Sequence, residues 1–159
     1  MTSRVLVALR VAATAERAFA VFTGEIGLWW QPNMLFRFSA GRPGTLALEP
    51  GLGGRLVERL PGGKVFEIGR VTVWEPGRRL AFTWRQASFK PGQATEVEVR
   101  FEPLDGATRV TVEHRGWDSI PQDHVARHTM PDAVFLHRHA EWWQQLLTSY
   151  LKRLAAPPS

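Results

Sequence analysis

The segment PDAVFLHRHAEWWQQLLTSYLKRL, residues 131–154, carries the longest helical pattern in the chain. Apolar side chains recur along it at alternating spacings of four and three residues, which places them on one face of an α-helix. The members of this apolar stripe are Leu136, Ala140, Trp143, Leu147, Tyr150 and Leu154. We predict an amphipathic helix of about six turns, and its large apolar face requires a broad partner surface.

The residues before this helix predict a sheet that can supply that surface. Residues 95–103 alternate apolar and charged side chains, and Asp105-Gly106 is typical of a hairpin turn into a second alternating run at 108–114. Turns rich in Gly and Pro separate most of the other predicted strands, which lie at 4–11, 45–49, 55–60, 64–74 and 79–87. This succession predicts an antiparallel meander that follows the first strand.

Two short helices are predicted between the first strand and the meander. Thr14 is a candidate N-cap for a helix that ends near Gly24, and residues 25–30 fit a second short turn before Pro32. One strand, two short helices, six strands and a long helix make an α+β arrangement.

Strand alternation assigns a set of apolar side chains to the sheet face that meets the long helix. They are Leu80, Phe82, Trp84, Val97, Val99, Phe101, Val110 and Val112. Such a stripe packs against the helix as a filled core, or it lines a cavity. The seven Trp residues favour either a heavily aromatic core or a cavity walled by rings.

Composition limits the class of protein. A chain of 159 residues that is 44% hydrophobic fits one domain, expected to span 1–159 with an ordered core at about 4–154. The absence of cysteine excludes disulfides, thiolate metal sites and thiol catalysis. No apolar run approaches the roughly 20 residues that cross a bilayer, so we expect a cytoplasmic protein without a membrane partner.

The net charge of +5 is spread along the chain rather than concentrated in a patch. Nucleic-acid-binding proteins usually show a clustered basic surface. We therefore expect no nucleic-acid partner.

Several motifs together carry a family resemblance. They are Gly53-Gly54, Gly69-Arg70-Val71, the run Trp74-Glu75-Pro76-Gly77-Arg78-Arg79-Leu80-Ala81-Phe82-Thr83-Trp84, and Thr108-Arg109-Val110-Thr111-Val112-Glu113-His114. With the order of elements, they resemble the START-like, Bet v 1-like (SRPBCC) superfamily, and within it the activator of Hsp90 ATPase homologue 1-like (AHSA1-like) group. The resemblance implies a helix-grip fold, β-α-α-β6-α, in which a curved antiparallel sheet wraps around the C-terminal helix.

The sequence departs from this group in two ways. Members commonly carry Gly-Trp early in the last helix, whereas Trp142 here precedes Trp143, so we expect Trp142 to change the local shape or to fill volume that relatives leave open. The eukaryotic co-chaperone has a separate N-terminal domain that is missing from this sequence, and we therefore do not expect Hsp90 as a partner.

The resemblance also implies an elongated cavity between the sheet and the last helix, for a small, largely apolar molecule. Its predicted walls are Trp30, Phe82, Trp84, Val99, Val112, His114, Trp143 and Leu147. No cofactor is expected, and the sequence leaves both catalysis and a homodimer open.

His114 shares the inner face of its strand with Val110 and Val112 by alternation. It is interpreted either as a hydrogen-bonded histidine where the core meets water, or as an acid or base with Glu58 or Asp118 as its polar partner. The second interpretation would make the protein a cyclase, dehydratase or hydrolase of apolar substrates. A third hypothesis is a protein-interaction module of the chaperone-activator type, with Trp142 and Trp117 as anchors if they are exposed.

Four histidines, His124, His128, His137 and His139, fall close together in the sequence. His124 and His128 have helical i, i+4 spacing, but the Glu of a zinc-binding H-E-x-x-H motif is absent. His137 and His139 point to opposite sides of a helix. We therefore expect no metal site, and a solvated or lid-forming histidine cluster is favoured.

Overall fold

The computed structural model describes residues 4–30, 44–84, 95–116 and 132–155, and at Arg4, at Pro61 and in 132–136 it describes the backbone alone. Its elements, in chain order, are β1 (Arg4–Val11), α1 (Ala15–Gly24), α2 (Ile26–Trp29), β2 (Thr45–Leu48), β3 (Arg55–Arg59), a 3-10 turn η1 (Pro61–Gly63), β4 (Val65–Glu75), β5 (Arg79–Trp84), β6 (Thr95–Leu104), β7 (Ala107–Arg115) and α3 (Asp132–Ala155). These bounds agree closely with the predicted strands and helices.

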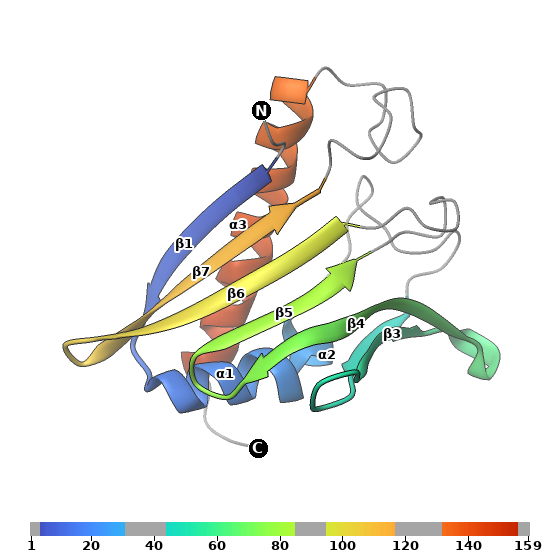
Figure 1. Cartoon of the computed structure of the whole chain (residues 1–159), viewed down its shortest axis with the longest axis horizontal. Coiled ribbons are helices and arrows are strands. Elements are labelled where there is room, and N and C mark those ends of the chain that lie inside the picture. Colours follow the sequence, from blue (N-terminus) through green and yellow to red (C-terminus); the bar gives the residue numbers. More distant parts are fainter. Residues whose placement is uncertain (1–3, 31–43, 85–94, 117–131, 156–159) are drawn as a thin grey trace.

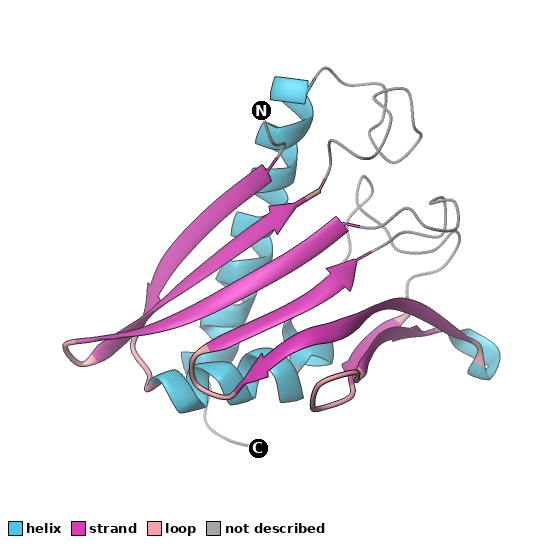
Figure 2. Cartoon of the chain, in the orientation of Figure 1, coloured by secondary structure: helices cyan, strands magenta, loops and turns pink. Residues whose placement is uncertain are grey.

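The seven strands form one antiparallel sheet in the order β1-β7-β6-β5-β4-β3-β2. The first strand therefore closes onto the last one, and the remaining strands follow as a meander. Figure 1 shows the sheet curving around α3, and the helices α1 and α2 lie at one end of it. Figure 2 shows the same three helices gathered on one side of the sheet. The predicted α+β helix-grip arrangement is confirmed.

Local signals in the sequence account for the first helix. Thr14 has extended backbone angles, and its side-chain oxygen accepts a hydrogen bond from the backbone N–H of Arg17 at 3.2 Å. This contact satisfies one of the N–H groups that the start of a helix leaves without a partner. The predicted N-cap is therefore confirmed, and α1 begins at the next residue.

The predicted inner face of the sheet is buried. All eight of its apolar side chains, on β5, β6 and β7, are at most 2% exposed. On β1 the same alternation buries Val5, Val7 and Val11, whereas Leu6 on the other face is 53% exposed. The sheet thus has one apolar face directed at the helices.

The buried face of α3 differs in part from the predicted stripe. Trp143, Leu147 and Tyr150 are buried as expected, but Ala140 and Leu154 are only half-buried, and the side chain of Leu136 lies outside the described residues. The helix buries three further side chains, which are His139, Trp142 and Leu146. The face is wider than one stripe because α3 contacts β1 as well as α1 and α2.

The C-terminal end of α3 is held against the two short helices α1 and α2. The Tyr150 ring packs against Phe22 and Trp29, with ring centroids 5.3 and 5.2 Å apart. Its hydroxyl donates a hydrogen bond to the Ala18 carbonyl oxygen at 2.7 Å. Arg153 and Glu25 form an ion pair at 2.5 Å. These contacts anchor the C-terminal half of α3.

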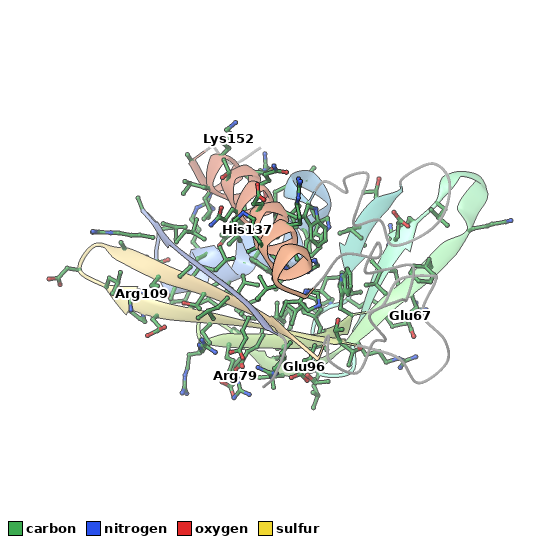
Figure 3. The ribbon with its side chains drawn as sticks, turned by 90° about the horizontal axis from the view of Figure 1, so that it is seen from above. Glu67, Arg79, Glu96, Arg109, His137 and Lys152 are labelled. Carbon is green, nitrogen blue, oxygen red and sulfur yellow. The ribbon has the colours of Figure 1, made fainter. Side chains whose placement is uncertain are left out.

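The outer face of the sheet is charged. Glu98 lies between three arginines, with Arg79 at 2.5 Å, Arg115 at 2.8 Å and Arg100 at 3.5 Å. Burial raises the pKa of Glu98, but the hydrogen bond from Arg115 and the charges of Arg79 and Arg115 outweigh that effect and keep the pKa below its ordinary value. In Figure 3, Arg79 and Glu96 extend from the side of the sheet opposite α3.

One glycine is required by close packing between two strands. A Cβ atom at Gly69 on β4 would overlap the carbonyl oxygen of Thr83 on β5. Gly69→Ala is therefore expected to lower the free energy of unfolding by about 3 kcal/mol, because the clash involves backbone that cannot turn away. Urea denaturation measures this change.

Gly24→Ala is the matched control. No described atom lies within 4 Å of a Cβ built at this helical position. It is expected to leave stability unchanged or to raise it by up to about 1 kcal/mol, because Ala loses less conformational entropy on folding. Equal effects of the two substitutions would contradict the assignment of Gly69 to a close strand contact.

Within the described part of the chain, no helix is both long enough and apolar enough to cross a membrane.

Candidate functional site

His114 lies near the end of β7 and is fully buried. Alternation along the strand directs it to the same face as Val110 and Val112, as the sequence predicts. In the sheet it is opposite Val5 of β1 on one side and Val97 of β6 on the other. One sequence-based interpretation of His114 is a hydrogen-bonded histidine where the core meets water. The contact with water is wrong, because His114 is 0% exposed.

Hydrogen bonds link His114 to both the sheet and α3. Its Nε2 is 2.6 Å from the Thr95 hydroxyl, which donates to the Trp84 carbonyl oxygen at 3.0 Å. Its Nδ1 is 3.3 Å from the indole nitrogen of Trp143 and 2.9 Å from Nε2 of His139. We call Trp84, Thr95, His114, His139 and Trp143 the imidazole relay.

The relay has one consistent pattern of donors and acceptors. The indole N–H of Trp143 can only donate, so Nδ1 of His114 must be an acceptor and the proton of His114 must lie on Nε2. That N–H donates to the oxygen of Thr95, whose own hydrogen is directed at the Trp84 carbonyl. Nε2 of His139 must then carry a proton to donate to Nδ1 of His114. His114 is therefore neutral in this arrangement.

Burial supports the neutral state of both rings. Burial lowers the pKa of His139 to about 3. Burial also lowers the pKa of His114 well below its ordinary value of 6.5, and repulsion from His139 adds to the effect. Desolvation penalises the charged form of an imidazole. For His114 the pattern of hydrogen bonds independently excludes that form.

The arrangement does not favour His114 as a general base. A base needs a lone pair within reach of the substrate proton. The only lone pair of the His114 ring, on Nδ1, already accepts from Trp143 and His139.

The pairing of His114 with either predicted polar partner stays a prediction. Glu58 is buried on β3, and three strands separate β3 from β7 in the sheet. Asp118 lies outside the described residues.

Aromatic rings surround the relay. Trp84 meets His114 edge to face with ring centroids 4.7 Å apart, and Trp142 lies 5.2 Å from His139. Trp30 contacts both Trp143 and Trp142, at 5.1 and 5.8 Å. The rings at this end of α3 therefore form one continuous cluster.

The predicted wall residues all lie in the interior. Trp30, Phe82, Trp84, Val99, Val112, His114, Trp143 and Leu147 are between 0 and 4% exposed. The structure brings Trp30, Trp84, His114 and Trp143 into the cluster around the relay. Their role as ligand contacts stays a prediction.

Two members of the relay were not predicted from the sequence. The solvated or lid-forming interpretation is wrong for His139, which is fully buried, although it holds for His137, whose side chain is 76% exposed and pairs with Glu141. The spacing from His139 to Trp143, Leu146 and Tyr150 is helical and would have indicated the buried face. Thr95 lies two residues before Val97, so strand alternation would have indicated that its side chain is directed to the inner face of the sheet.

Trp142 is 2% exposed, so it is not an exposed interface anchor. It occupies interior volume between Trp30, Trp84 and His139, in agreement with the second of the two roles expected for it. Trp117, His124 and His128 lie outside the described residues. Among the residues that are described, no three metal-ligating side chains come together.

A surface pocket of about 940 Å³ opens at the opposite end of the sheet. The turns before α1, between β4 and β5, and between β6 and β7 line it, with Thr14, Gly77 and Leu104 among its residues. This pocket is not at the predicted position between the sheet and α3. It is therefore an alternative candidate for a ligand site.

Comparison with solved structures shows the same fold. Protein MLL2253 from Mesorhizobium loti matches over 94% of this chain and 94% of its own, with a TM-score of 0.65 and 18% identity. Protein CV1439 from Chromobacterium violaceum matches over 98% of this chain and 99% of its own, with a TM-score of 0.66 and 16% identity. The Aha1 dimer from Colwellia psychrerythraea matches over 95% of each chain, with a TM-score of 0.63 and 15% identity.

No curated protein matches the sequence. The family described as activator of Hsp90 ATPase homolog 1-like protein matches residues 12–156, which is most of the chain. This match agrees with the curved sheet, the order of elements and the position of α3. The chain therefore belongs to the activator of Hsp90 ATPase homolog 1-like (AHSA1-like) family.

Proposed function

We propose that the protein binds a small, largely apolar molecule between the curved sheet and α3. The observation that carries the proposal is the aromatic cluster around the imidazole relay, a set of large rings with a few polar groups among them. Ligand sites in proteins commonly combine apolar and aromatic walls with a small number of placed polar groups. Membership of the AHSA1-like family adds support, because the curved sheet of this fold surrounds its helix.

The relay favours an uncharged ligand. His114 and His139 are neutral, and neither ring offers a full charge to a ligand ion. Burying a carboxylate or an ammonium group without a partner of opposite charge is strongly unfavourable. We therefore expect neutral ring compounds to bind in preference to fatty-acid anions of similar size.

Fluorescence titration tests the proposal. Tryptophan emission would be followed while adding a neutral panel of N-phenyl-1-naphthylamine, a flavonoid and a sterol, with a fatty acid as the charged comparison. At least one neutral compound is expected to quench the emission saturably at a one-to-one ratio. No saturable binding by any of the four compounds would contradict the proposal.

Two matched substitutions locate the binding. Trp84→Phe trims a ring at the relay, whereas Trp74→Phe trims a half-buried ring of β4 that packs against Phe19 with centroids 5.0 Å apart. Trp84→Phe is expected to weaken binding about tenfold, which corresponds to about 1.4 kcal/mol. Trp74→Phe is expected to leave the Kd within about twofold. The opposite order would place the ligand elsewhere.

A further inference from the structure

Among the described side chains on the outer face of the sheet, two pairs of arginines lie directly opposite each other on neighbouring strands. Arg79 on β5 is opposite Arg100 on β6, and Arg10 on β1 is opposite Arg109 on β7. Like charges in this position repel each other and lower the stability of a sheet. Each pair is therefore stabilised by an anion that lies close to both guanidinium groups.

The protein itself supplies an anion to the first pair. The carboxylate of Glu98 lies 2.5 Å from Nε of Arg79 and 3.5 Å from Nη1 of Arg100. Arg100 also pairs with Glu113 at 3.4 Å. This arrangement shows that one carboxylate can contact two arginines that are paired across strands of this sheet.

The second pair has no such carboxylate. Within the described part of the chain, no acid forms an ion pair with Arg10 or Arg109, although Glu102 on β6 is opposite Arg109. Nη2 of Arg10 donates instead to the backbone carbonyl oxygen of Asp105 at 3.3 Å. Both arginines are exposed, and Figure 3 shows Arg109 toward the hairpin between β6 and β7. An anion from solution can therefore reach the pair.

The Arg10–Arg109 pair borders the surface pocket of about 940 Å³. Ala12 lines this pocket and follows Arg10 by two residues. Ala107 also lines it and precedes Arg109 by two residues. The carbonyl that accepts from Arg10 lies between residues 104 and 106, which both line the pocket. A ligand in the pocket can therefore extend a charged end to the arginines.

The pocket itself suits an apolar group. Small and apolar side chains form most of its lining, among them Ala13, Pro76 and Leu104. The two charged residues that line it, Glu16 and Arg78, have opposite signs and give the pocket no net charge. Its volume falls within the roughly 300–1,000 Å³ of small-molecule sites. The preference for an anion therefore comes from the neighbouring arginine pair.

We propose that Arg10 and Arg109 bind the carboxylate or phosphate group of a small amphipathic molecule, whose apolar part lies in the adjoining pocket. Guanidinium groups bind both kinds of anion through paired N–H donors. This second site differs in ligand class from the one between the sheet and α3, which favours uncharged molecules. Neither site depends on the other.

NMR titration tests the site with four probes that carry both parts of the ligand or only one. Octanoate and octyl phosphate carry both parts, 1-octanol lacks the charge, and inorganic phosphate lacks the apolar chain. In low salt at pH 6.5, at least one of the two amphipathic anions is expected to shift the Nε–H signals of Arg10 and Arg109 and the amides of 104–107 saturably. Its affinity is expected to exceed those of 1-octanol and inorganic phosphate at these signals by about fivefold or more.

The tighter of the two anions identifies the group that the arginines prefer. If neither anion shifts these signals saturably, the proposal is wrong. Equal affinity for 1-octanol would overturn the role of the arginines, and equal affinity for inorganic phosphate would overturn the role of the pocket.

Substitutions that each remove one positive charge separate a specific site from general attraction to a basic protein. Arg10→Gln and Arg109→Gln are each expected to weaken binding of the tighter anion about fivefold. Arg138→Gln removes the same charge from an exposed position on α3 and is expected to change the affinity by less than about twofold. All three side chains are exposed, and urea denaturation checks that the variants are folded. Equal weakening in the three variants would contradict the site.

Discussion

Replacing Trp143 by Ala is expected to lower the free energy of unfolding by about 4 kcal/mol, as for other fully buried tryptophans. The side chain is 0% exposed and contacts the rings of Trp30 and Trp142. Its removal leaves a cavity that the neighbouring rings of Trp142 on α3 and of Trp30, just after α2, cannot fill without moving. It also removes one of the two donors to Nδ1 of His114.

Urea denaturation at pH 7.5 measures this change, and Leu151→Ala on the same helix is the control. Leu151 is 39% exposed, so its truncation is expected to change stability by less than about 1 kcal/mol. Trp143→Phe supplies a milder variant in case the Ala variant does not fold, with an expected loss of about 2 kcal/mol. A loss below about 1 kcal/mol in both Trp143 variants would contradict the packing described here.

Replacing His114 by Phe is the second large effect, with an expected loss of about 3 kcal/mol at pH 7.5. The ring volume is nearly retained, but the substitution removes the shared acceptor of two buried N–H groups, on Trp143 and His139. A buried donor that loses its acceptor costs roughly 1–3 kcal/mol. Thr95 also loses the donor to its oxygen, while its bond to the Trp84 carbonyl persists.

A double-mutant cycle with His139→Phe provides the control. If His114 and His139 interact directly, the double variant is expected to be more stable than the sum of the two single losses predicts, by about 1 kcal/mol. Removing both partners of a hydrogen bond avoids the penalty for leaving one of them without a partner. Strict additivity in urea denaturation would show that the 2.9 Å contact contributes nothing.

Most of the fold follows from local sequence patterns. Alternation fixed which face of β5, β6 and β7 is buried, because a strand directs neighbouring side chains to opposite faces. Turn residues such as Asp105-Gly106 marked the ends of strands, and Thr14 marked the start of α1. The order of strands in the sheet is not a local property, and it followed from the family resemblance.

The relay was only partly predictable. Strand parity identified His114 as an inward residue, but the partner of a buried polar group depends on how α3 is rotated against the sheet. That rotation is set by contacts with β1, α1 and α2, which widen the buried face to include His139 and Trp142. An apolar stripe drawn on hydrophobic residues alone leaves out a histidine, even when its helical spacing to Trp143 is correct.

The most direct test of the account is a map of where a neutral ligand binds. Side-chain NMR signals of the protein would be followed during titration with N-phenyl-1-naphthylamine at pH 7.5. We expect the largest shifts at the indole signals of Trp84 and Trp143 and at the imidazole of His114, with little change near Leu104. Shifts confined to the surface pocket around Thr14, Gly77 and Leu104, or no shifts at all, would contradict a ligand site between the sheet and α3.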